Sequence, residues 1–284
     1  MKIGLALGGG SARGLAHIPM LEAFDELGIK PSVIAGCSMG ALVGALYAGG
    51  MSGRDIREHA TKHLSRRMDF ARHVFGTRQT RLGQLFTMSS LLSLRLDGQT
   101  LANLAMPDDL PQLIEDQKIP LKIIATNYET MEEAVFTTGS VVAAVGASIA
   151  IPGVISGPHI NGHLHVDGGV KNPVPFNHAK ADITVAIDVT GRPRKLLGKN
   201  PSSIELAVGS MLIMFNELAA LRHAQSSPEI YIQPQLDGVG ASDFFRLNHI
   251  LDLAAPSKDE LKHHLNRHIE ARIQGKLSDA SEKS

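Results

Sequence analysis

The sequence predicts an α/β fold with a mainly parallel sheet, and two stretches near the N-terminus carry that prediction. The apolar run 2–7 has the length of a buried strand and leads through a glycine-rich loop into apolar residues at helical spacing over 13–27. A second apolar run, 32–35, ends in a Gly-x-Ser-x-Gly turn that leads into a helix of small residues over 41–48. Two strands joined by a helix form a right-handed βαβ unit, so the two strands are expected to be parallel.

The later elements follow from apolar periodicity and turn residues. Strands are expected over 121–126, 134–137, 183–189 and 229–233, with a hairpin over 159–166 around Asn161-Gly162. Helices are expected over 140–148, 204–223 and 243–253, and a capping box of Ser257 and Glu260 predicts a last helix from 257 to about 274. There is no internal repeat and no low-complexity linker, so 1–277 is predicted to be a single domain, and 278–284 a disordered tail.

The composition argues against a nucleic-acid partner. The 28 basic and 28 acidic side chains cancel, so the whole chain carries no positive electrostatic footprint. Tryptophan is absent and aromatic residues make up only 4% of the chain, which leaves few side chains on which bases could stack.

Residues 51–106 form a basic stretch in which cations far outnumber acids. We interpret it as a helical insertion over the sheet, acting as a lid or as a membrane-surface patch. The alternative is a pair of solvated helices that only covers the sheet edge. The cations are Arg54, Arg57, Lys62, Arg66, Arg67, Arg72, Arg78, Arg81 and Arg95.

The first residues and the single cysteine predict a cytoplasmic protein. The N-terminal apolar run is only as long as a strand, whereas a signal peptide needs a longer apolar core and a cleavage site. No apolar run approaches the length of a transmembrane helix. Cys37 cannot form an internal disulfide. Through the basic insertion, peripheral contact with the inner face of the membrane is also expected.

The turn at 36–40 has the form of a nucleophile elbow. Ser38 stands between strand and helix, with Gly36 and Gly40 two residues to either side. A serine in a strained backbone conformation needs neighbours without a Cβ where strand and helix approach each other. Taken alone, the pentapeptide fits a structural turn equally well. Cys37 is interpreted as a small buried hydrophobe, because strand alternation directs it away from Ser38.

The glycine-rich loop fits an anion site better than a nucleotide site. GGGSARG at 8–14 has no register for G-x-G-x-x-G, and Leu15 stands where a phosphate-binding loop needs lysine. What remains is a set of backbone N–H groups at a helix N-terminus beside Arg13. Acyl transfer needs such donors, since its tetrahedral intermediate carries an oxyanion.

A nucleophilic serine also needs a base, and Asp167 is the candidate. It ends a short strand and is followed by Gly168 and Gly169, which let the backbone bend tightly. A carboxylate hydrogen-bonded to Ser38 could serve as the base of a two-residue dyad. The alternative is an ordinary Asp-Gly turn with no catalytic role. A Ser-His-Asp triad in the chain order serine, acid, histidine would need a late histidine on a loop just after a strand, and none of the late histidines is placed there. They are His223, His249, His263, His264 and His268.

Taken together, these motifs resemble the patatin-like phospholipases. The motifs are GGGSARGLAH at 8–17, GCSMG at 36–40, ATN at 125–127, ASIAIPG at 147–153 and DGG at 167–169, and the resemblance covers about residues 2–190. It implies a three-layer α/β/α fold with a mainly parallel central sheet, and a catalytic dyad of Ser38 and Asp167. It further implies an oxyanion hole from the backbone of Gly9, Gly10 and Ser11, with Arg13 close by.

The resemblance also implies the reaction. Patatin-like enzymes hydrolyse acyl esters of phospholipids or lysophospholipids without a required metal, so a lipid or acyl-ester substrate and no cofactor are expected. Three departures from the family pattern leave every catalytic group in place. Ser11 replaces a usual glycine, Pro19 falls inside the first helix and is expected to kink it or end its regular bonding, and 172–175 reads NPVP, a form that a bacterial subset shares.

Two further clusters have a functional and a structural interpretation. His159, His163 and His165 lie close to Asp167 in sequence and could suggest a metal site, but the hairpin explains their spacing better. The apolar residues of the long helix could form a lipid groove, with core packing as the preferred interpretation. These residues are Leu206, Met211, Leu212, Met214, Phe215 and Leu218.

The leading hypothesis is therefore a serine acyl hydrolase with a Ser38–Asp167 dyad. One alternative is a Ser-His-Asp esterase acting on small soluble esters. The other is a non-catalytic regulatory protein that retains the fold and acts through partners. Nothing in the sequence indicates the oligomeric state.

Overall fold

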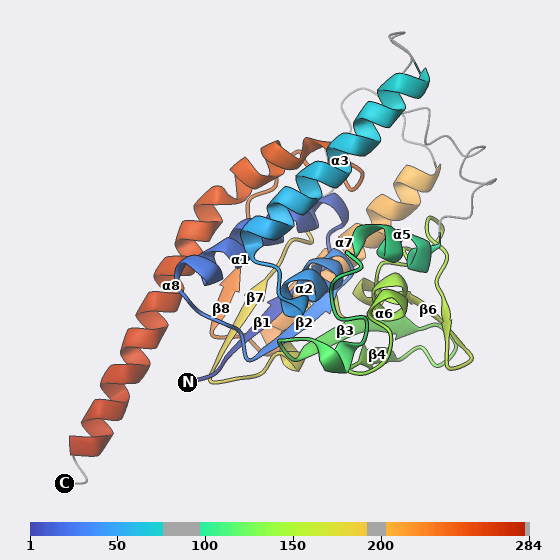
Figure 1. The fold of residues 1–284 in the computed structure, drawn as a ribbon. Coiled ribbons are helices and arrows are strands. Elements are labelled where there is room, and N and C mark those ends of the chain that lie inside the picture. The colour runs from blue at the N-terminus through green and yellow to red at the C-terminus, as the bar shows by residue number, and fades with distance from the viewer. Residues whose placement is uncertain (76–96, 192–202, 282–284) are drawn as a thin grey trace.

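Helices cover both faces of a central sheet in the computed structural model, which describes residues 1–75, 97–191 and 203–281 (Figure 1). The strands are β1 (Ile3–Leu7), β2 (Val33–Cys37), β3 (Leu121–Asn127), β4 (Glu133–Phe136), β5 (His159–Ile160), β6 (His163–Asp167), β7 (Ile183–Ile187) and β8 (Ile230–Ile232). The α-helices are α1 (His17–Glu26), α2 (Met39–Gly49), α3 (Gly53–Phe75), α5 (Gly98–Ala105), α6 (Val141–Ser148), α7 (Ser203–Gln225) and α8 (Leu247–Ser281). Short 3-10 turns join them, among them η1 (Ser11–Ala16).

The sheet has eight strands in the order β5-β6-β3-β2-β1-β7-β8, with β4 paired to β3 off this path. The five strands from β3 to β8 along this order are parallel, as predicted. Strands β4, β5 and β6 pair antiparallel at one end of the sheet. The Asn161-Gly162 turn joins β5 to β6 with both residues at positive φ, which is the two-residue hairpin geometry expected of that dipeptide.

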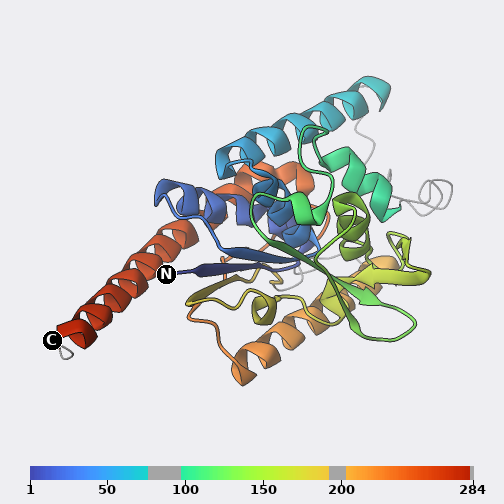
Figure 2. The ribbon, with the colours of Figure 1, turned by 60° about the horizontal axis from the view of Figure 1, so that its bottom comes forward.

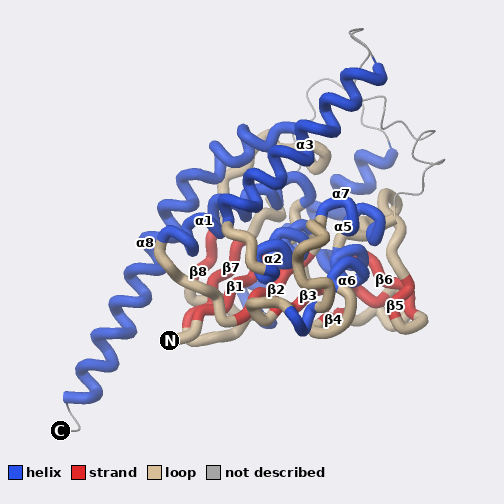
Figure 3. Tube along the Cα trace, in the orientation of Figure 1, coloured by secondary structure: helices blue, strands red, loops and turns tan. Residues whose placement is uncertain are grey.

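Helices lie on both sides of the sheet (Figure 2), and its two faces carry side chains of different size. Leu5, Leu7 and Ile34 belong to the main core, together with buried residues of α1, α2, α6 and α8. The alternate residues Ala6 and Ala35 face the opposite layer, where they cluster with the chain segment 174–179 and with Ala219 of α7. Because side chains alternate along a strand, the large residues face one layer and the alanines face the other. Figure 3 shows the helices of both layers around the strands.

Strand β6 takes over the edge of β3 where β2 stops, and this positions the site. Strand β2 pairs with residues 121–124 of β3, and β6 pairs with residues 125–127. Because β4 pairs with residues 123–126 and overlaps both, β2 and β6 must share the other edge of β3. The last residue of β2, Cys37, lies opposite Ile124, and the last residue of β6, Asp167, lies opposite Ala125. The two strands therefore run toward each other and meet end to end.

The first helix begins later than the sequence predicted. Residues 11–16 form the 3-10 turn η1, and regular α-helix begins only at His17. Pro19 consequently lies in the first turn of α1, where its missing N–H leaves no helical hydrogen bond unmade. The expected kink inside a helix over 13–27 is thus replaced by a change from 3-10 to α geometry.

The C-terminal region is one helix rather than two. Helix α8 runs from Leu247 to Ser281 with Pro256 inside it, so Ser257 does not cap a new helix (Figure 1). Proline removes one hydrogen bond without ending the helix here, since Leu251, Ala254 and Leu261 on either side of it are buried in the main core. The helix also continues past Ser278, where the sequence predicted a disordered tail. Around Pro256, packing against the main core overrides the local stop signal.

The insertion 51–106 is helical in its described parts, α3 and α5, while 76–96 lie outside the described residues. Two of its cations are paired with acids. Arg54 contacts Glu58, and Arg57 forms two hydrogen bonds with Glu22 of α1. Within the described ranges, no helix is long and apolar enough to cross a membrane.

Candidate active site

Ser38 occupies a strained turn between β2 and α2. Its backbone has φ 51° and ψ −122°, a conformation that costs a residue with a Cβ about 1–3 kcal/mol. The turn is possible because the chain on either side is glycine: a Cβ on Gly40 would lie 2.1 Å from the carbonyl oxygen of Leu7, and one on Gly36 would collide with the backbone of α2. The strain that the sequence predicted for this serine is therefore present.

The hydroxyl of Ser38 donates a hydrogen bond to the carboxylate of Asp167, 2.7 Å from Oγ to Oδ2. Both side chains are buried. The other carboxylate oxygen, Oδ1, accepts from the N–H of Gly169 at 2.8 Å, and Thr126 Oγ1 donates to the backbone carbonyl of Asp167. Asp167 is thus held at both its side chain and its backbone, with one oxygen directed at Ser38.

No role was expected for Ser148 from the sequence, although this residue holds the elbow in place. Its hydroxyl accepts from the backbone N–H of Ser38 at 2.7 Å and donates to the carbonyl of Ile124 at 2.5 Å. Ile124 lies opposite the last residue of β2, where the sheet ladder passes from β2 to β6. Ser148 therefore satisfies two buried backbone groups at this junction. Its only sequence signal is its place in the ASIAIPG segment.

Burial raises the pKa of Asp167 from 3.8 to about 6. Desolvation disfavours the charged carboxylate, and the hydrogen bonds from Gly169 and Ser38 oppose that effect only in part. A carboxylate with a pKa near 6 is a much stronger base than an exposed one, while it stays ionised at neutral pH.

The glycine-rich loop lines the cavity above Ser38, and its backbone N–H groups differ in whether they are already hydrogen-bonded. The N–H of Gly8 donates to Ile187, and that of Gly9 donates to Pro173. Gly9, Gly10 and Ser11 all line the cavity above Ser38. Among the described residues, no acceptor pairs with the N–H groups of Gly10 and Ser11, whereas the N–H of Gly9 is already used. The geometry thus favours Gly10 and Ser11 as oxyanion donors over Gly9.

Arg13 does not reach the cavity within the described structure. Its side chain is fully buried, and Nη1 donates to the carbonyl of Val239 at 3.2 Å. Asp188 lies close enough to interact with the guanidinium electrostatically. Arg13 is therefore placed to anchor the loop from below, which differs from the expected position beside the oxyanion.

His17 is a second anchor of the same loop. Its Nε2 lies 2.7 Å from the carbonyl oxygen of Gly8, and the ring is completely buried. Because a carbonyl can only accept, Nε2 must carry the proton. Burial lowers the pKa of His17 to about 4, so the ring stays neutral. His17 is part of the GGGSARGLAH motif, but its spacing alone did not reveal this contact.

Helix α7 covers the cavity with apolar side chains. Met211, Leu212 and Phe215 line it together with Ile151. A Cβ on Gly169 would lie 2.4 Å from the ring of Phe215, so a side chain at this position would push the ring away. Core packing, the interpretation preferred from sequence, does not fully describe Met211, Leu212 and Phe215, because these residues also cover the cavity above Ser38.

The histidines lie elsewhere. No described histidine is hydrogen-bonded to Ser38 or Asp167. His165 is buried against Phe136 and contacts the carbonyl of His163, and His223 stacks on Tyr231. In the described ranges no group of histidine, cysteine and acidic side chains could hold a metal ion. This arrangement gives no support to a Ser-His-Asp triad.

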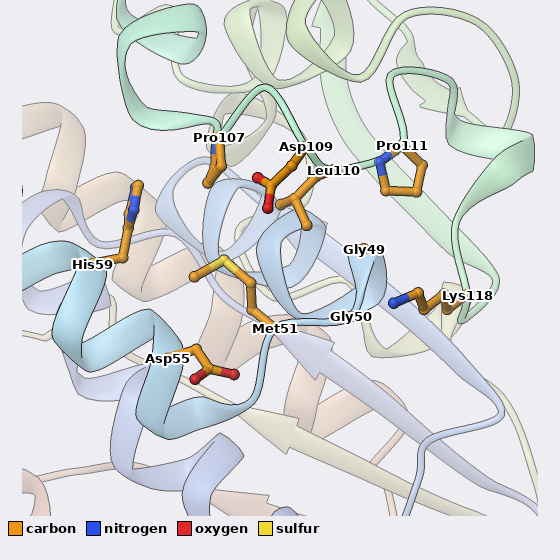
Figure 4. Close-up of a pocket in the computed structure, with 10 residues that line it drawn as sticks. All are labelled: Gly49, Gly50, Met51, Asp55, His59, Pro107, Asp109, Leu110, Pro111 and Lys118. Atoms are coloured by element: carbon orange, nitrogen blue, oxygen red, sulfur yellow. The ribbon is translucent and has the colours of Figure 1, made fainter.

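A larger cavity, of about 760 Å³, lies at the opposite end of α2 from Ser38 (Figure 4). It is lined by Gly49 and Gly50 at the C-terminal end of that helix and by Asp55, His59 and Lys118 among others. Ser52 caps α3 by accepting from the N–H of Asp55, whose carboxylate accepts from the N–H of Ser52, and His59 contacts the carbonyl of Ala105. None of the residues predicted to act in catalysis lies here, so size alone does not identify the active site.

Comparison with known proteins identifies the family. The sequence model of the family described as "Patatin-like phospholipase" matches residues 5–180. An uncharacterized NTE family protein of Mycobacterium tuberculosis is 35% identical over 193 residues, 67% of this chain and 49% of that protein. A lysophospholipase NTE1 of Cryptococcus neoformans is 34% identical over 181 residues, 62% of this chain and 10% of that protein. The chain thus spans half or less of the length of these relatives.

Among solved structures, VipD from Legionella pneumophila aligns with 92% of this chain and 66% of its own, with a TM-score of 0.47 and 14% sequence identity. The family match extends from the glycine-rich loop past the Asp-Gly-Gly turn, and so includes both Ser38 and Asp167. The chain therefore belongs to the patatin-like phospholipase family.

Proposed function

We propose that the protein is a serine acyl hydrolase that cleaves acyl esters of phospholipids or lysophospholipids through a Ser38–Asp167 dyad. The observation that carries the proposal is the 2.7 Å hydrogen bond from Ser38 Oγ to Asp167 Oδ2, in a strained turn that faces a cavity. A serine hydroxyl is a weak nucleophile until a neighbouring base removes its proton. Here the base is already in contact with that proton.

In the acylation step, Ser38 Oγ attacks the ester carbonyl carbon while its proton moves to Asp167 Oδ2. The carbonyl π electrons move to the oxygen, and the resulting oxyanion accepts hydrogen bonds from the N–H groups of Gly10 and Ser11. Each such donor contributes about 3 kcal/mol of transition-state stabilisation. Ser38 also precedes the first residue of α2, where the helix dipole favours negative charge.

Collapse of the intermediate breaks the bond to the alcohol oxygen, which takes the proton from Asp167 and leaves. Water then attacks the acyl-serine and gives a proton to Asp167. When the second intermediate collapses, Ser38 Oγ recovers that proton and the fatty acid is released. Asp167 thus alternates between base and acid, a role that suits its raised pKa.

The cavity lining supports a lipid as the substrate. Met211, Leu212, Phe215 and Ile151 offer an apolar surface to an acyl chain next to the nucleophile. Lysophospholipase is also the activity in the printed name of the Cryptococcus neoformans relative. Cytoplasmic location stays a prediction. Membrane contact through the basic insertion also stays a prediction, and two of the cations of the insertion, Arg54 and Arg57, are paired with acids.

The pH dependence of catalysis is expected to report Asp167. Only the ionised carboxylate can accept the serine proton, so kcat/KM for a soluble ester should rise with pH, reach half its maximum near pH 6 and level off above about pH 7. Steady-state rates across pH 4–9 measure this rise in kcat/KM, with the fold verified by circular dichroism at each end of the range. If the residual activity of Asp167→Asn rises with the same midpoint, the titrating group is not Asp167.

The function itself is tested by a panel of phospholipids, lysophospholipids and short-chain esters, with released fatty acid identified by mass spectrometry. The wild-type chain is expected to release fatty acid from lipid esters, and a folded Ser38→Ala variant to release none above background. Hydrolysis confined to short soluble esters would favour a small-molecule esterase. No hydrolysis of any ester by the wild-type chain would favour a regulatory protein.

A further inference from the structure

Helix α7 contains an uncharged stretch, 206–216, that is apolar on two opposite sides. Its inner side carries the cavity residues Met211, Leu212 and Phe215. Its outer side exposes Leu206, Ile213 and Met214, with 52%, 49% and 61% of their surfaces accessible. Ile213 and Met214 follow Leu206 by seven and eight positions, which places the three on one helix face, with the exposed Ser210 between them. A helix with apolar residues on opposite sides is normally buried in protein or in lipid.

The cavity above Ser38 is closed by the same stretch. Its free space amounts to about 10 Å³, which is room for roughly one water molecule. An ester of a fatty acid cannot reach Ser38 Oγ unless the side chains of Met211, Leu212 and Phe215 move away. Those side chains belong to a small cluster that is separate from the main core, so their displacement leaves the main core intact.

We propose that the outer face of 206–216 docks on the surface of a lipid aggregate, and that docking lets this stretch swing out and uncover Ser38. The inference rests on the proposed function, because it supplies the route by which a lipid substrate enters. On docking, Leu206, Ile213 and Met214 transfer from water into hydrocarbon. Once the stretch is displaced, its inner side chains find an apolar environment there as well.

Two observations favour a lipid surface over a second copy of the chain. The exposed face is continuous, around a single helix, with the lining of the cavity that takes the acyl chain. Three side chains also offer far less area than the roughly 800 Å² per partner that a stable dimer buries. In Figures 1 and 2 the N-terminal end of α7 lies beyond the carboxyl ends of the parallel strands, the edge at which Ser38 is placed.

Docking is tested by co-sedimentation with phosphatidylcholine vesicles, using the Ser38→Ala chain so that no lipid is hydrolysed. We expect Ile213→Gln/Met214→Gln to lower the vesicle partition coefficient by at least about tenfold. Because the contact is apolar, binding of the Ser38→Ala parent chain should persist at high salt. The control is Ile273→Gln on α8, which removes an isoleucine that is 53% exposed and should bind like the parent chain.

Uncovering of Ser38 is tested by the rate at which a water-soluble fluorophosphonate labels the wild-type serine. Addition of vesicles is expected to raise the labelling rate of the wild-type chain at least about tenfold. The rate with vesicles divided by the rate without them should be near one for Ile213→Gln/Met214→Gln and the same as in wild type for Ile273→Gln. Equal vesicle binding by all variants, or loss of self-association in the double variant, would overturn the docking proposal. If Ser38 is labelled at the same rate with and without vesicles, uncovering is wrong while the hydrolase proposal stands; if Ser38 is never labelled, the hydrolase proposal itself fails.

Discussion

Replacement of Asp167 by asparagine is expected to lower kcat for ester hydrolysis by at least about a thousandfold, while the protein stays folded. The amide is nearly isosteric with the carboxylate but cannot accept a proton from Ser38 Oγ. Proton transfer by a positioned side chain contributes about 10²–10⁴-fold to a rate, and here it also generates the nucleophile. Stopped-flow or steady-state assay of a soluble activated ester measures the loss. Retention of more than a tenth of the wild-type kcat would contradict the role of Asp167 as base.

The same substitution is expected to stabilise the protein at neutral and alkaline pH. The pKa of Asp167 is about 6 in the folded chain, against 3.8 for an ordinary aspartate, so the unfolded chain ionises first as pH rises. Stability due to this group is present at low pH and is lost between pH 3.8 and 6. Relative to wild type, Asp167→Asn should therefore gain roughly 3 kcal/mol in free energy of unfolding between pH 3 and pH 8. Urea unfolding of both proteins at each pH measures this difference.

This combination of results separates a catalytic from a structural aspartate. If Asp167 served only to hold the turn after β6, its replacement would lower stability at every pH, and activity would fall in parallel with the folded fraction. A large loss of kcat together with a gain in stability is typical of a group whose burial serves function.

Ser148→Ala is expected to have the second largest effect, on both stability and rate. The change leaves the buried N–H of Ser38 and the buried carbonyl of Ile124 without their shared partner. An unsatisfied buried group costs about 1–3 kcal/mol, so the free energy of unfolding should fall by about 2–4 kcal/mol. Because the backbone of Ser38 is no longer held, kcat should fall about 10- to 100-fold with little change in KM.

Two variants control for this prediction. Ser148→Thr keeps the hydroxyl and should recover most of the kcat. Ser140→Ala removes the hydroxyl that caps the other end of α6, so it should cost about 1 kcal/mol in stability and leave kcat unchanged. A Ser148→Ala enzyme with wild-type kcat would show that the strained turn needs no support from α6.

The parts of the fold that depend on local patterns could be predicted from the sequence. The parallel strands, the elbow and the Asn161-Gly162 hairpin each follow from a contiguous run of residues whose geometry is set by sterics. The meeting of β2 and β6 at one edge of β3 could not be predicted, since it depends on which strands pair and in which register. Ser148 escaped notice for the same reason: its partners, Ser38 and Ile124, are far away in sequence.

The predictions that differ from the structure share a physical cause. Ser257 has the sequence pattern of a helix N-cap, but α8 continues through Pro256 and Ser257 because its residues on either side pack in the main core. Arg13 was expected at the anion site because of its position in the motif, but η1 turns its side chain toward Val239 instead. The apolar residues of α7 were predicted to pack in the core, because helical periodicity cannot distinguish a core residue from one that covers a cavity.

Mass spectrometry of the enzyme during turnover tests the central claim most directly. The protein is mixed with an activated ester, quenched in acid within the first turnovers, and digested for peptide mapping. The Ser38–Asp167 account predicts one acyl group per chain, attached to Ser38, and its absence from the Asp167→Asn protein quenched at the same time. An acyl group on the neighbouring Cys37 or on another residue, or steady hydrolysis with no acyl-enzyme and undiminished activity in Ser38→Ala, would contradict it.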